Sequence, residues 1–281
     1  MKKFLNFMLV ACLMFSGMMV LSACNDNPGF VGDVWDGTKT TVSAAVNNEI
    51  TIETAEELAG FAEDVNNGTD YYGITIKLTQ DLDLKNKLWT PIGKLIVNGS
   101  TSVLEESHLF KGTFDGGNRK IHNLKVESST SQQKVQHDQT GVFAVGLFGA
   151  IKGTVKNVKV VNAEVTGNHF VAVIAGWGSR NTVVENCHVE NAEVSCIYAN
   201  DDESGDKAGA IMGATHGVIN NCSVKNTAID ADRDAGQIVG CLIDTAASQE
   251  GNTVVNVTVT DNNINQTPNE NIKNEPVGRI R

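Results

Sequence analysis

A six-residue pattern of alternating apolar and polar positions recurs from residue 121 onward. Each copy begins with Ile or Val and carries an Asn at its third position, and the copies occupy residues 121–126, 155–160, 184–189, 219–224 and 254–259. They recur with a period of roughly 30–35 residues, which is typical of solenoid proteins built from stacked repeats. Alternation with a period of two residues favours strands over helices. The pattern therefore indicates a β-solenoid.

Two further short apolar elements accompany the later copies. One ends in Gly and precedes the copy, at residues 147–149, 174–176, 211–213 and 238–240; the other follows it, at residues 162–165, 191–194, 226–229 and 261–264. Three short strands per repeat, rich in Val and Ile, are typical of a parallel β-helix. We predict an all-β solenoid of this kind with three strands per turn over residues 49–281, with its repeats at about 110–265.

Equivalent positions in successive turns should stack in ladders about 4.8 Å apart. The alignment predicts one ladder of inward side chains, made of Val158, Cys187, Cys222 and Val257 with Leu124 beneath. In this ladder the two cysteines act as small apolar residues. A disulfide between them is the alternative, and the sequence leaves the state of Cys196 and Cys241 open. The repeated asparagines at 123, 157, 186, 221 and 256 predict side-chain hydrogen bonds with backbone or with neighbouring asparagines.

Residues 54–67 depart from the strand pattern. Thr54 and Glu57 form a capping box, and an apolar stripe follows before Asn67 and Gly68 end the segment. We predict a helix here that covers the open end of the solenoid, which otherwise presents an unpaired strand edge. Alternating runs at residues 74–78 and 82–84 predict the first strands after it.

The N-terminus carries an export signal. Lys2 and Lys3 precede an apolar run, and Leu21-Ser-Ala-Cys24 completes a lipoprotein cleavage box. We predict a signal peptide over residues 1–23, lipidation of Cys24 including an acyl chain such as palmitate, and a tether over residues 24–48 with one strand at about 40–45. A single membrane-spanning helix is the alternative, but the run is short and interrupted. This arrangement predicts attachment to the outer membrane. The sequence does not decide between its surface side and its periplasmic side.

Charge narrows the range of partners. The chain has 33 acidic and 22 basic residues, a net charge of −11, and no cluster of Lys and Arg. Binding to a phosphate backbone needs such clusters. Nucleic acid is therefore excluded as a partner, whereas a glycan or a protein remains a candidate ligand.

Several segments resemble one known family. They include residues 54–68, Ile76-Lys-Leu-Thr-Gln-Asp-Leu-Asp-Leu84, Trp89-Thr-Pro-Ile-Gly93, Phe110-Lys-Gly-Thr-Phe-Asp-Gly-Gly117 and Gly146-Leu-Phe-Gly149. Residues 50 to about 260 are similar in this way to GLUG-motif bacterial lipoproteins. The resemblance implies a right-handed, pectin-lyase-like parallel β-helix with an adhesin-like role, and it supplies no catalytic residues. The paired glycines usual in that family are replaced here by Ala172-Val173 and Gly209-Ala210.

Candidate chemistry is sparse. Asp201, Asp202, Glu203 and Asp206 form the densest acidic cluster and are the candidate calcium ligands, with a solvated acidic loop as the alternative. Glu164 and Glu193 occupy equivalent repeat positions, but Ala228 follows them, so no column of carboxylates results. The sequence contains no nucleophile elbow, phosphate loop or metal-binding histidine pair. No catalytic residue is therefore assigned, and no cofactor other than calcium.

The expected function is non-enzymatic binding of a glycan or a protein. Length variation in a solenoid is confined to its turns, so we expect the longer loops to carry specificity. These loops cover residues 93–109, 128–140, 198–207 and 244–252. A carbohydrate-active lyase or hydrolase is the first alternative, because this fold hosts such enzymes. A purely structural role in the envelope is the second alternative.

Overall fold

A computed structural model describes residues 30–98, 103–105, 108–127, 143–197, 207–231, 234–243, 253–255, 257–260, 263–266 and 277–280. The chain from Gly32 to Arg281 forms one compact unit, and it contains the helix and all the strands described below. The predicted signal peptide, Cys24 and the acidic cluster from Asp201 to Asp206 lie outside the described residues. So do most of the three loops predicted at 128–140, 198–207 and 244–252.

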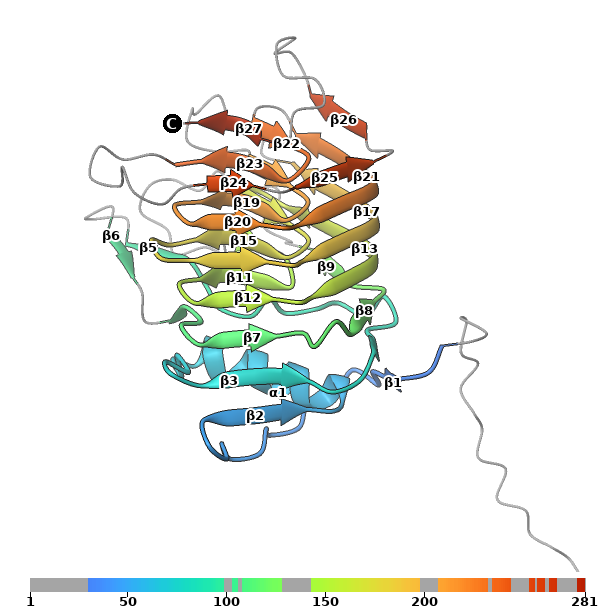
Figure 1. Cartoon of the computed structure of the whole chain (residues 1–281), viewed down its shortest axis with the longest axis vertical. Helices are drawn as coiled ribbons and strands as arrows, with labels where there is room; N and C mark the ends of the chain where they lie inside the picture. The colour runs from blue at the N-terminus through green and yellow to red at the C-terminus, as the bar shows by residue number, and fades with distance from the viewer. Residues whose placement is uncertain are drawn as a thin grey trace, which may run out of the picture. The chain divides into compact units, whose positions relative to one another are not determined.

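Short strands stack into coils whose strands pair in parallel with those of the next coil (Figure 1). One coil consists of β12 (Thr154–Lys156), β13 (Lys159–Gly167), β14 (Phe170–Ala172) and β15 (Ala175–Gly178). The next consists of β16 (Val183–Glu185), β17 (His188–Cys196), β18 (Lys207–Gly209) and β19 (Met212–Thr215). A third consists of β20 (Val218–Asn220), β21 (Ser223–Ala231), β22 (Asp234–Gly236) and β23 (Val239–Leu242).

Four parallel sheets run through these coils, and we name each after its strand in the first coil above. The β12 sheet has the order β2-β3-β7-β12-β16-β20-β24, and the β13 sheet has the order β1-β4-β8-β13-β17-β21-β25, with β9 also on β13 and β26 on β21. The β14 sheet is β10-β14-β18-β22 and the β15 sheet is β11-β15-β19-β23-β27. The predicted all-β, parallel β-helix-like fold is therefore confirmed.

The remaining strands complete the two ends of these sheets. Those before the first full coil are β1 (Asp33–Val34), β2 (Glu49–Ile52), β3 (Thr75–Leu78), β4 (Leu82–Asp83), β7 (Thr113–Asp115), β8 (Lys120–His122), β9 (Lys125–Glu127), β10 (Ala144–Val145) and β11 (Phe148–Ile151). Those after the third coil are β24 (Thr253–Val255), β25 (Thr258–Thr260), β26 (Asn263–Gln266) and β27 (Val277–Ile280). The loop predicted at 93–109 contains an antiparallel hairpin of β5 (Ile96–Asn98) and β6 (Val103–Glu105).

The division of each coil into strands differs in detail from the prediction. Three strands per turn were expected, whereas each complete coil has four. The six-residue element is divided between two strands. Its first residues lie in β12, and its last residues join the third element in the long strand β13, which passes through Asn162 in the left-handed region. The additional strands are those of the β14 sheet, such as β14 and β18. These have only three residues each, which is too few to show an alternating pattern in the sequence.

The inward side chains form the predicted ladders. Val155 pairs in register with Val184, and Val184 with Ile219; all three are fully buried. Hydrogen bonds from His188 N to Val158 O at 2.8 Å and from Ser223 N to Cys187 O at 3.0 Å place the next ladder as expected. Burying an aliphatic side chain contributes roughly 1.5–3 kcal/mol. Each coil therefore gains its stability from contact with its neighbours.

The cysteines act as small buried core residues, which is the first of the two interpretations given above. Cys187, Cys196, Cys222 and Cys241 are all buried, free thiols. Burial raises the pKa of the Cys187 thiol, and its contact with Cys222 raises that pKa further. The disulfide alternative is therefore not the state in this structure.

The first predicted repeat is out of register with the others. Lys120 pairs with Lys159 and Lys125 with Glu164, so Asn123 lies opposite Asn162 rather than Asn157. The prediction that Leu124 lies beneath Val158 is therefore wrong. The shift is five residues, because residues 121–126 are equivalent to residues 160–165, and Phe114 of β7 is the residue that pairs with Val155. Asn123 and Asn162 both follow an apolar strand, so the local motif does not distinguish the two corners of a coil.

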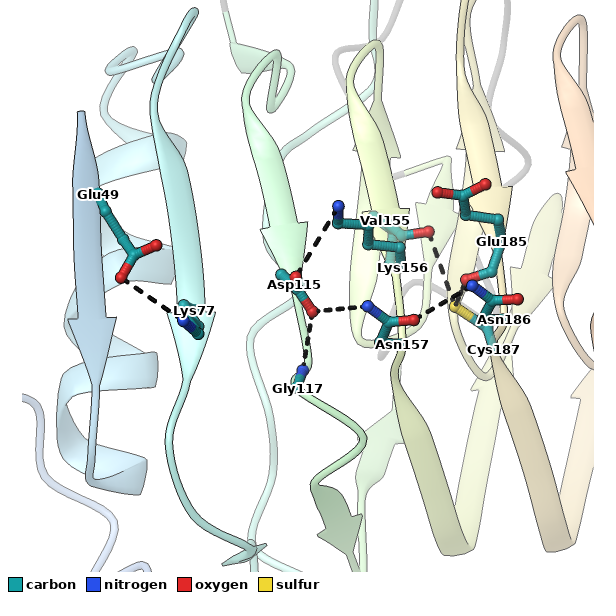
Figure 2. Close-up of polar contacts among 10 residues, drawn as sticks. All are labelled: Glu49, Lys77, Asp115, Gly117, Val155, Lys156, Asn157, Glu185, Asn186 and Cys187. Carbon is teal, nitrogen blue, oxygen red and sulfur yellow. Dashed lines mark hydrogen bonds and ion pairs between the residues drawn. The ribbon is translucent and has the colours of Figure 1, made fainter. Parts of the chain in front are cut away.

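Asparagines at the corners form two ladders of side-chain amides. One starts at Asp115 Oδ1, which accepts from Asn157 Nδ2 at 2.9 Å, and continues to Asn186 (Figure 2). Asn221 extends it by a further bond to Asn186. The other starts at Asp83 Oδ1, which accepts from Asn123 Nδ2 at 2.7 Å, and continues through Asn162, Asn191 and Asn226. These asparagines have φ between 49° and 59°, which Asn tolerates better than most residues. The predicted hydrogen-bonding role is confirmed for Asn123, Asn157, Asn186 and Asn221, whereas Asn256 lies outside the described residues.

The predicted helix covers the N-terminal end of the stack. α1 spans Ala55–Asn66, and the capping box of Thr54 and Glu57 is present in full. Its residues Leu58, Phe61 and Val65 are fully buried in the core shared with the strands. The strands predicted at residues 74–78 and 82–84 are present as β3 and β4. Within the part of the chain that the structure describes, no helix is long and apolar enough to cross a bilayer.

Candidate functional site

Two hollows on the surface hold polar side chains. The first, here called the cap pocket, has a volume of about 320 Å³ and lies between α1 and two loop segments. Its lining residues are Trp35, Gly37, Thr38, Lys39, Ala59, Ala62, Glu63, Asn66, Asn67, Leu88, Trp89, Thr90 and Lys94. The second, here called the Glu groove, has a volume of about 260 Å³ and lies on the outer face of the β13 sheet.

One wall of the cap pocket is the segment 35–40, held against α1 at Gly60. Thr40 N donates to Glu56 O at 2.9 Å, and Asp36 N donates to Glu56 Oε1 at 2.9 Å. A Cβ atom at Gly60 would lie 1.9 Å from Thr40 O, so only glycine permits this approach. A glycine inside a helix costs about 1 kcal/mol relative to alanine. Gly60 therefore lowers the stability of α1 but allows segment 35–40 to pack against the helix.

Two tryptophans form the floor of the cap pocket. The Trp35 and Trp89 rings meet edge to face at 71°, with centroids 5.6 Å apart. Trp35 Nε1 donates to Thr38 O at 2.7 Å and Trp89 Nε1 donates to Leu147 O at 3.0 Å. Both side chains are buried, so they provide an apolar wall. Leu88, which is 62% exposed, adds an apolar side chain to the lining.

Asn66 is the central polar residue of the cap pocket. It is 6% exposed; its Nδ2 donates to Pro91 O at 2.9 Å. Its main-chain oxygen accepts from Lys94 Nζ at 3.4 Å and from His108 Nδ1 at 3.1 Å. Its side-chain oxygen Oδ1 is buried and has no hydrogen-bond partner. This atom is closed off from the pocket surface, so Asn66 serves mainly to join α1 to the segment around Pro91.

The charged side chains in the lining of the cap pocket are two lysines and one glutamate. Lys39 and Glu63 form an ion pair across the pocket. Lys94 supports the C-terminal end of α1, whose last turn contains no basic residue of its own. A cation at this end offsets the partial negative charge of the unpaired helix carbonyls. The described lining therefore carries a formal charge of +1, because Lys94 is offset only by the partial charge of the helix end.

The Glu groove is lined by Lys125, Val126, Glu127, Glu164, Val165, Thr166, Glu193 and Ser195. Glu164 and Glu193 lie opposite each other in register, and Ala228 follows them on β21. The predicted interruption of the carboxylate column is thus present. Lys125 Nζ lies 3.2 Å from Glu164 Oε2, in a pair that is largely exposed. Such a pair contributes little stability, about 0–1 kcal/mol.

Metal binding has no support within the described ranges. They contain no group of three or more His, Cys, Asp and Glu side chains placed to hold an ion. The candidate calcium ligands Asp201, Asp202, Glu203 and Asp206 fall outside these ranges and stay a prediction. Lipidation of Cys24 is likewise still a prediction.

Sequence reasoning missed the cap pocket. Its residues come from three separate segments that carry no repeating pattern, around residues 35–39, 59–67 and 88–94. The available signal was Gly60, an isolated glycine in a strongly capped helix, which indicates close approach of another chain segment. Even so, the sequence does not reveal which segment approaches.

Comparisons with known proteins give limited similarity. No family model matches the chain. Halomucin from Haloquadratum walsbyi is 27% identical over 150 residues, which are 50% of this chain, and the chain spans about 2% of the length of that protein. A solved structure described as a "putative immunoglobulin A1 protease" from Bacteroides ovatus has a TM-score of 0.36 and 13% identity, covering 83% of this chain and 82% of that one. Similarity at this level carries no argument about activity.

Proposed function

We propose that this protein is a non-enzymatic, adhesin-like binding protein of the cell envelope, and that the cap pocket is its ligand site. The observation that carries the proposal is the cap pocket itself, a hollow of about 320 Å³ whose lining combines two tryptophans with threonine, asparagine and lysine residues. Binding sites typically combine an apolar wall with a few placed polar groups. The ligand class that fits the sequence and the pocket is a glycan, with a protein surface as the second candidate.

The envelope location rests on the N-terminal sequence. Cleavage before Cys24 and lipidation of that residue would attach the chain to the outer membrane, on its surface or its periplasmic side. The resemblance to GLUG-motif lipoproteins supports the same location and an adhesin-like role. Calcium bound by Asp201, Asp202, Glu203 and Asp206 would then act on loop structure rather than on chemistry.

The alternative function is a carbohydrate-active enzyme, and the Glu groove is where its chemistry would take place. Glycoside hydrolysis needs two carboxylates on either side of the sugar bond. Glu164 and Glu193 lie on adjacent strands of one flat face, and Lys125 already pairs with Glu164. Two neighbouring carboxylates on one side of a substrate do not provide the flanking geometry. This arrangement favours binding over catalysis.

The decisive experiment is a glycan-array screen with product analysis. The chain from Asn25 onward retains the whole compact unit Gly32–Arg281 and is suited to this test. We expect saturable binding and intact glycans, with calcium tested by its addition and removal. Cleaved or unsaturated products would replace the proposal with the enzyme. Absence of binding to every glycan would overturn the glycan assignment.

A matched pair of variants locates the site. Ala59→Phe fills the cap pocket from α1 and removes no hydrogen-bonding side chain, whereas Ala228→Phe adds the same ring beside Glu193 on the exposed face. We expect Ala59→Phe to abolish binding and Ala228→Phe to retain it. The reverse result would place the ligand in or near the Glu groove and overturn the cap pocket as the site.

A further inference from the structure

We infer that the corner between the β15 sheet and the β12 sheet binds a linear acidic glycan, which lies along the stack and contacts basic side chains of successive coils. This surface, here called the basic corner, carries Lys111, Lys152, Arg180 and His216, which precede β7, β12, β16 and β20. None of the four lines the cap pocket, so the inference goes beyond the proposed function and adds a second contact surface. The cluster is not visible in the sequence, because its members come from different coils.

The fold stacks the residues of the basic corner along one edge. Lys152 N donates to Phe110 O at 2.8 Å, which sets Lys152 beside Lys111 of the preceding coil. Burial lowers the pKa of His216, and the nearby charge of Arg180 lowers it further, so these two side chains are also neighbours. Adjacent strands of a sheet are about 4.8 Å apart. The corner therefore presents basic groups at short, regular intervals.

Glycine packs this corner tightly. In two coils the basic residue is followed by Gly and Thr, at residues 111–113 and 152–154. A Cβ atom at Gly153 would lie 2.1 Å from Gly112 O, so the two backbones touch here and only glycine permits the approach. Both glycines are buried, whereas the lysine before each and the threonine after each are half-buried. Each of these coils therefore holds one lysine and one threonine side chain at the surface.

The basic corner has an excess of positive charge. Lys111, Lys152 and Arg180 supply three cations, and Asp70 offsets one of them, with its Oδ2 3.2 Å from Lys111 Nζ. The described segments that form the corner contain no Asp or Glu; they are residues 110–113, 151–154, 178–183 and 215–218. Arg180 is exposed, and the side chain of Lys111 is 26% exposed, so a ligand can reach them. Charges more than about 8 Å away are largely screened at physiological salt, so this local excess outweighs the net charge of the chain.

The rows beside the corner favour a single extended chain over a broad polyanion. The nearest row of the β12 sheet is uncharged from Thr75 onward and consists of Thr75, Thr113, Thr154, Val183 and Val218. The row beyond it alternates in charge and consists of Lys77, Asp115, Lys156 and Glu185 (Figure 2). A membrane surface or a nucleic acid duplex would also cover that second row and meet its carboxylates. A single glycan chain contacts the cations and the threonine hydroxyls alone.

The chemistry of the corner matches an acidic sugar chain. Lys and Arg donate charge-assisted hydrogen bonds to carboxylate or sulfate oxygens, and these are roughly twice as strong as neutral ones. Threonine hydroxyls both donate to and accept from sugar hydroxyls. Because the cations are spread over successive coils, we expect a ligand with several acidic groups to bind more tightly than an acidic monosaccharide.

The test titrates the chain from Asn25 with three hexasaccharides in a calorimeter. Hyaluronan carries carboxylates, chondroitin 4-sulfate carries carboxylates and sulfates, and chitohexaose is neutral. We expect an acidic probe to bind, with an affinity that falls as the salt concentration rises, because exposed charges are screened. Binding of either acidic probe supports the inference, and their relative affinities identify the preferred anion. Absence of binding by both would overturn it.

A matched pair of double variants locates the acidic probe. Lys152→Gln with Arg180→Gln removes two cations from the basic corner, whereas Lys77→Gln with Lys156→Gln removes two from the alternating row. We expect the first variant to weaken binding at least tenfold and the second to change it less than threefold, with thermal midpoints reporting the fold. Arg180→Glu, at an exposed position, gives the same test if the first variant does not fold. Equal losses in both double variants, or full binding by a folded corner variant, would overturn the inference.

Ala59→Phe separates this inference from the proposed function. It fills the cap pocket, so we expect the acidic probe to keep its Kd while a ligand of the cap pocket is lost. Loss of the acidic probe in Ala59→Phe would place that probe in the cap pocket, which would overturn the basic corner and leave the proposed function standing. Absence of any acidic binding, with neutral array glycans still bound, would likewise overturn this inference alone.

Discussion

The coils from β12 to β23 and the capped end around α1 bury their polar groups by different means. In the coils, each corner Asn bonds to the Asn of the adjacent coil, so one local solution is repeated along the stack. At the capped end, single residues bond to segments far away in the sequence, as Asn66 does with Pro91 and His108. The repeated region uses one local solution many times, whereas the capped end joins single residues from separate segments around one pocket. That pocket is why the ligand site is assigned to the cap.

The largest effect is expected from a charge inside the stack. Val184→Asp places a carboxylate between Val155 and Ile219, at a fully buried position without a cation. We expect a loss of more than about 4 kcal/mol in the free energy of unfolding, because an unpaired charge is buried. Urea denaturation followed by circular dichroism measures it. Val183→Asp, whose position is half-buried beside it, is the control and should cost about 1 kcal/mol or less.

A smaller loss is expected from breaking an amide ladder. Asn186→Ala removes the bonds to Asn157 and Asn221 and places alanine at φ 52°, so we expect a cost of about 2–3 kcal/mol. Asn186→Gly removes the same bonds without the conformational penalty and should cost about 1 kcal/mol less. Denaturation midpoints of the two variants separate the contributions. Equal costs would show that the left-handed conformation is of no importance there.

At the cap, Gly60→Ala tests the close approach of segment 35–40. The added Cβ meets Thr40 O, which costs about 1–3 kcal/mol and outweighs the gain in helix propensity of about 1 kcal/mol. We expect a modestly lower thermal midpoint together with a changed Trp35 environment, seen in its indole signal. A higher midpoint would show that the segment moves away at no cost.

The smallest effect is expected from acid. Burial lowers the pKa of His188, and its in-register neighbour Lys159 lowers it further. The folded chain therefore keeps this imidazole neutral while the unfolded chain binds a proton as the pH falls below about 6.5, so stability decreases on acidification. Urea midpoints at pH 7.5 and 5.5 should differ, and the difference should shrink in His188→Gln. Burial raises the pKa of Asp115, but hydrogen bonds from Asn157 and Gly117 outweigh it and hold the pKa below its usual range. The contribution of Asp115 to stability is therefore lost only below about pH 4.

The repeated region was predictable because its signals occur in many copies. Inward residues such as Val155 and Val184 recur with the period of the coil, and Thr54 with Glu57 identifies the start of α1. The register of Asn123 was not predictable, because each coil has two Asn corners of similar local sequence and Asn123 belongs to the one that contains Asn162. The strand expected at about residues 40–45 is absent; β1 at Asp33–Val34 takes the edge position beside β4 instead. Edge strands this short leave little pattern in a sequence.

The candidate site was less predictable than the fold for a physical reason. The cap pocket depends on Gly60 admitting Thr40 and on Asn66 reaching Pro91, and neither contact belongs to the repeat pattern. A residue that occurs once can be assigned a role only after its neighbours are known. The carboxylates Glu164 and Glu193 show the converse: their equivalence was visible in the sequence, and their position on an open face was not.

The direction of the amide ladders constrains how such a chain can grow. Each Asn donates to the coil before it, and each ladder begins at an aspartate, Asp83 or Asp115, whose Oδ1 also accepts the main-chain N–H of Lys85 or Gly117. A carboxylate has no amide hydrogen to pass on to an earlier coil. A duplicated coil can therefore be inserted after Asn157, because its Asn would donate to Asn157 and accept from the next Asn. A coil inserted ahead of Asp115 would receive no hydrogen bond from that carboxylate. Lengthening by gene duplication is directional, and the capped end that carries the pocket stays unchanged while the stack extends away from it.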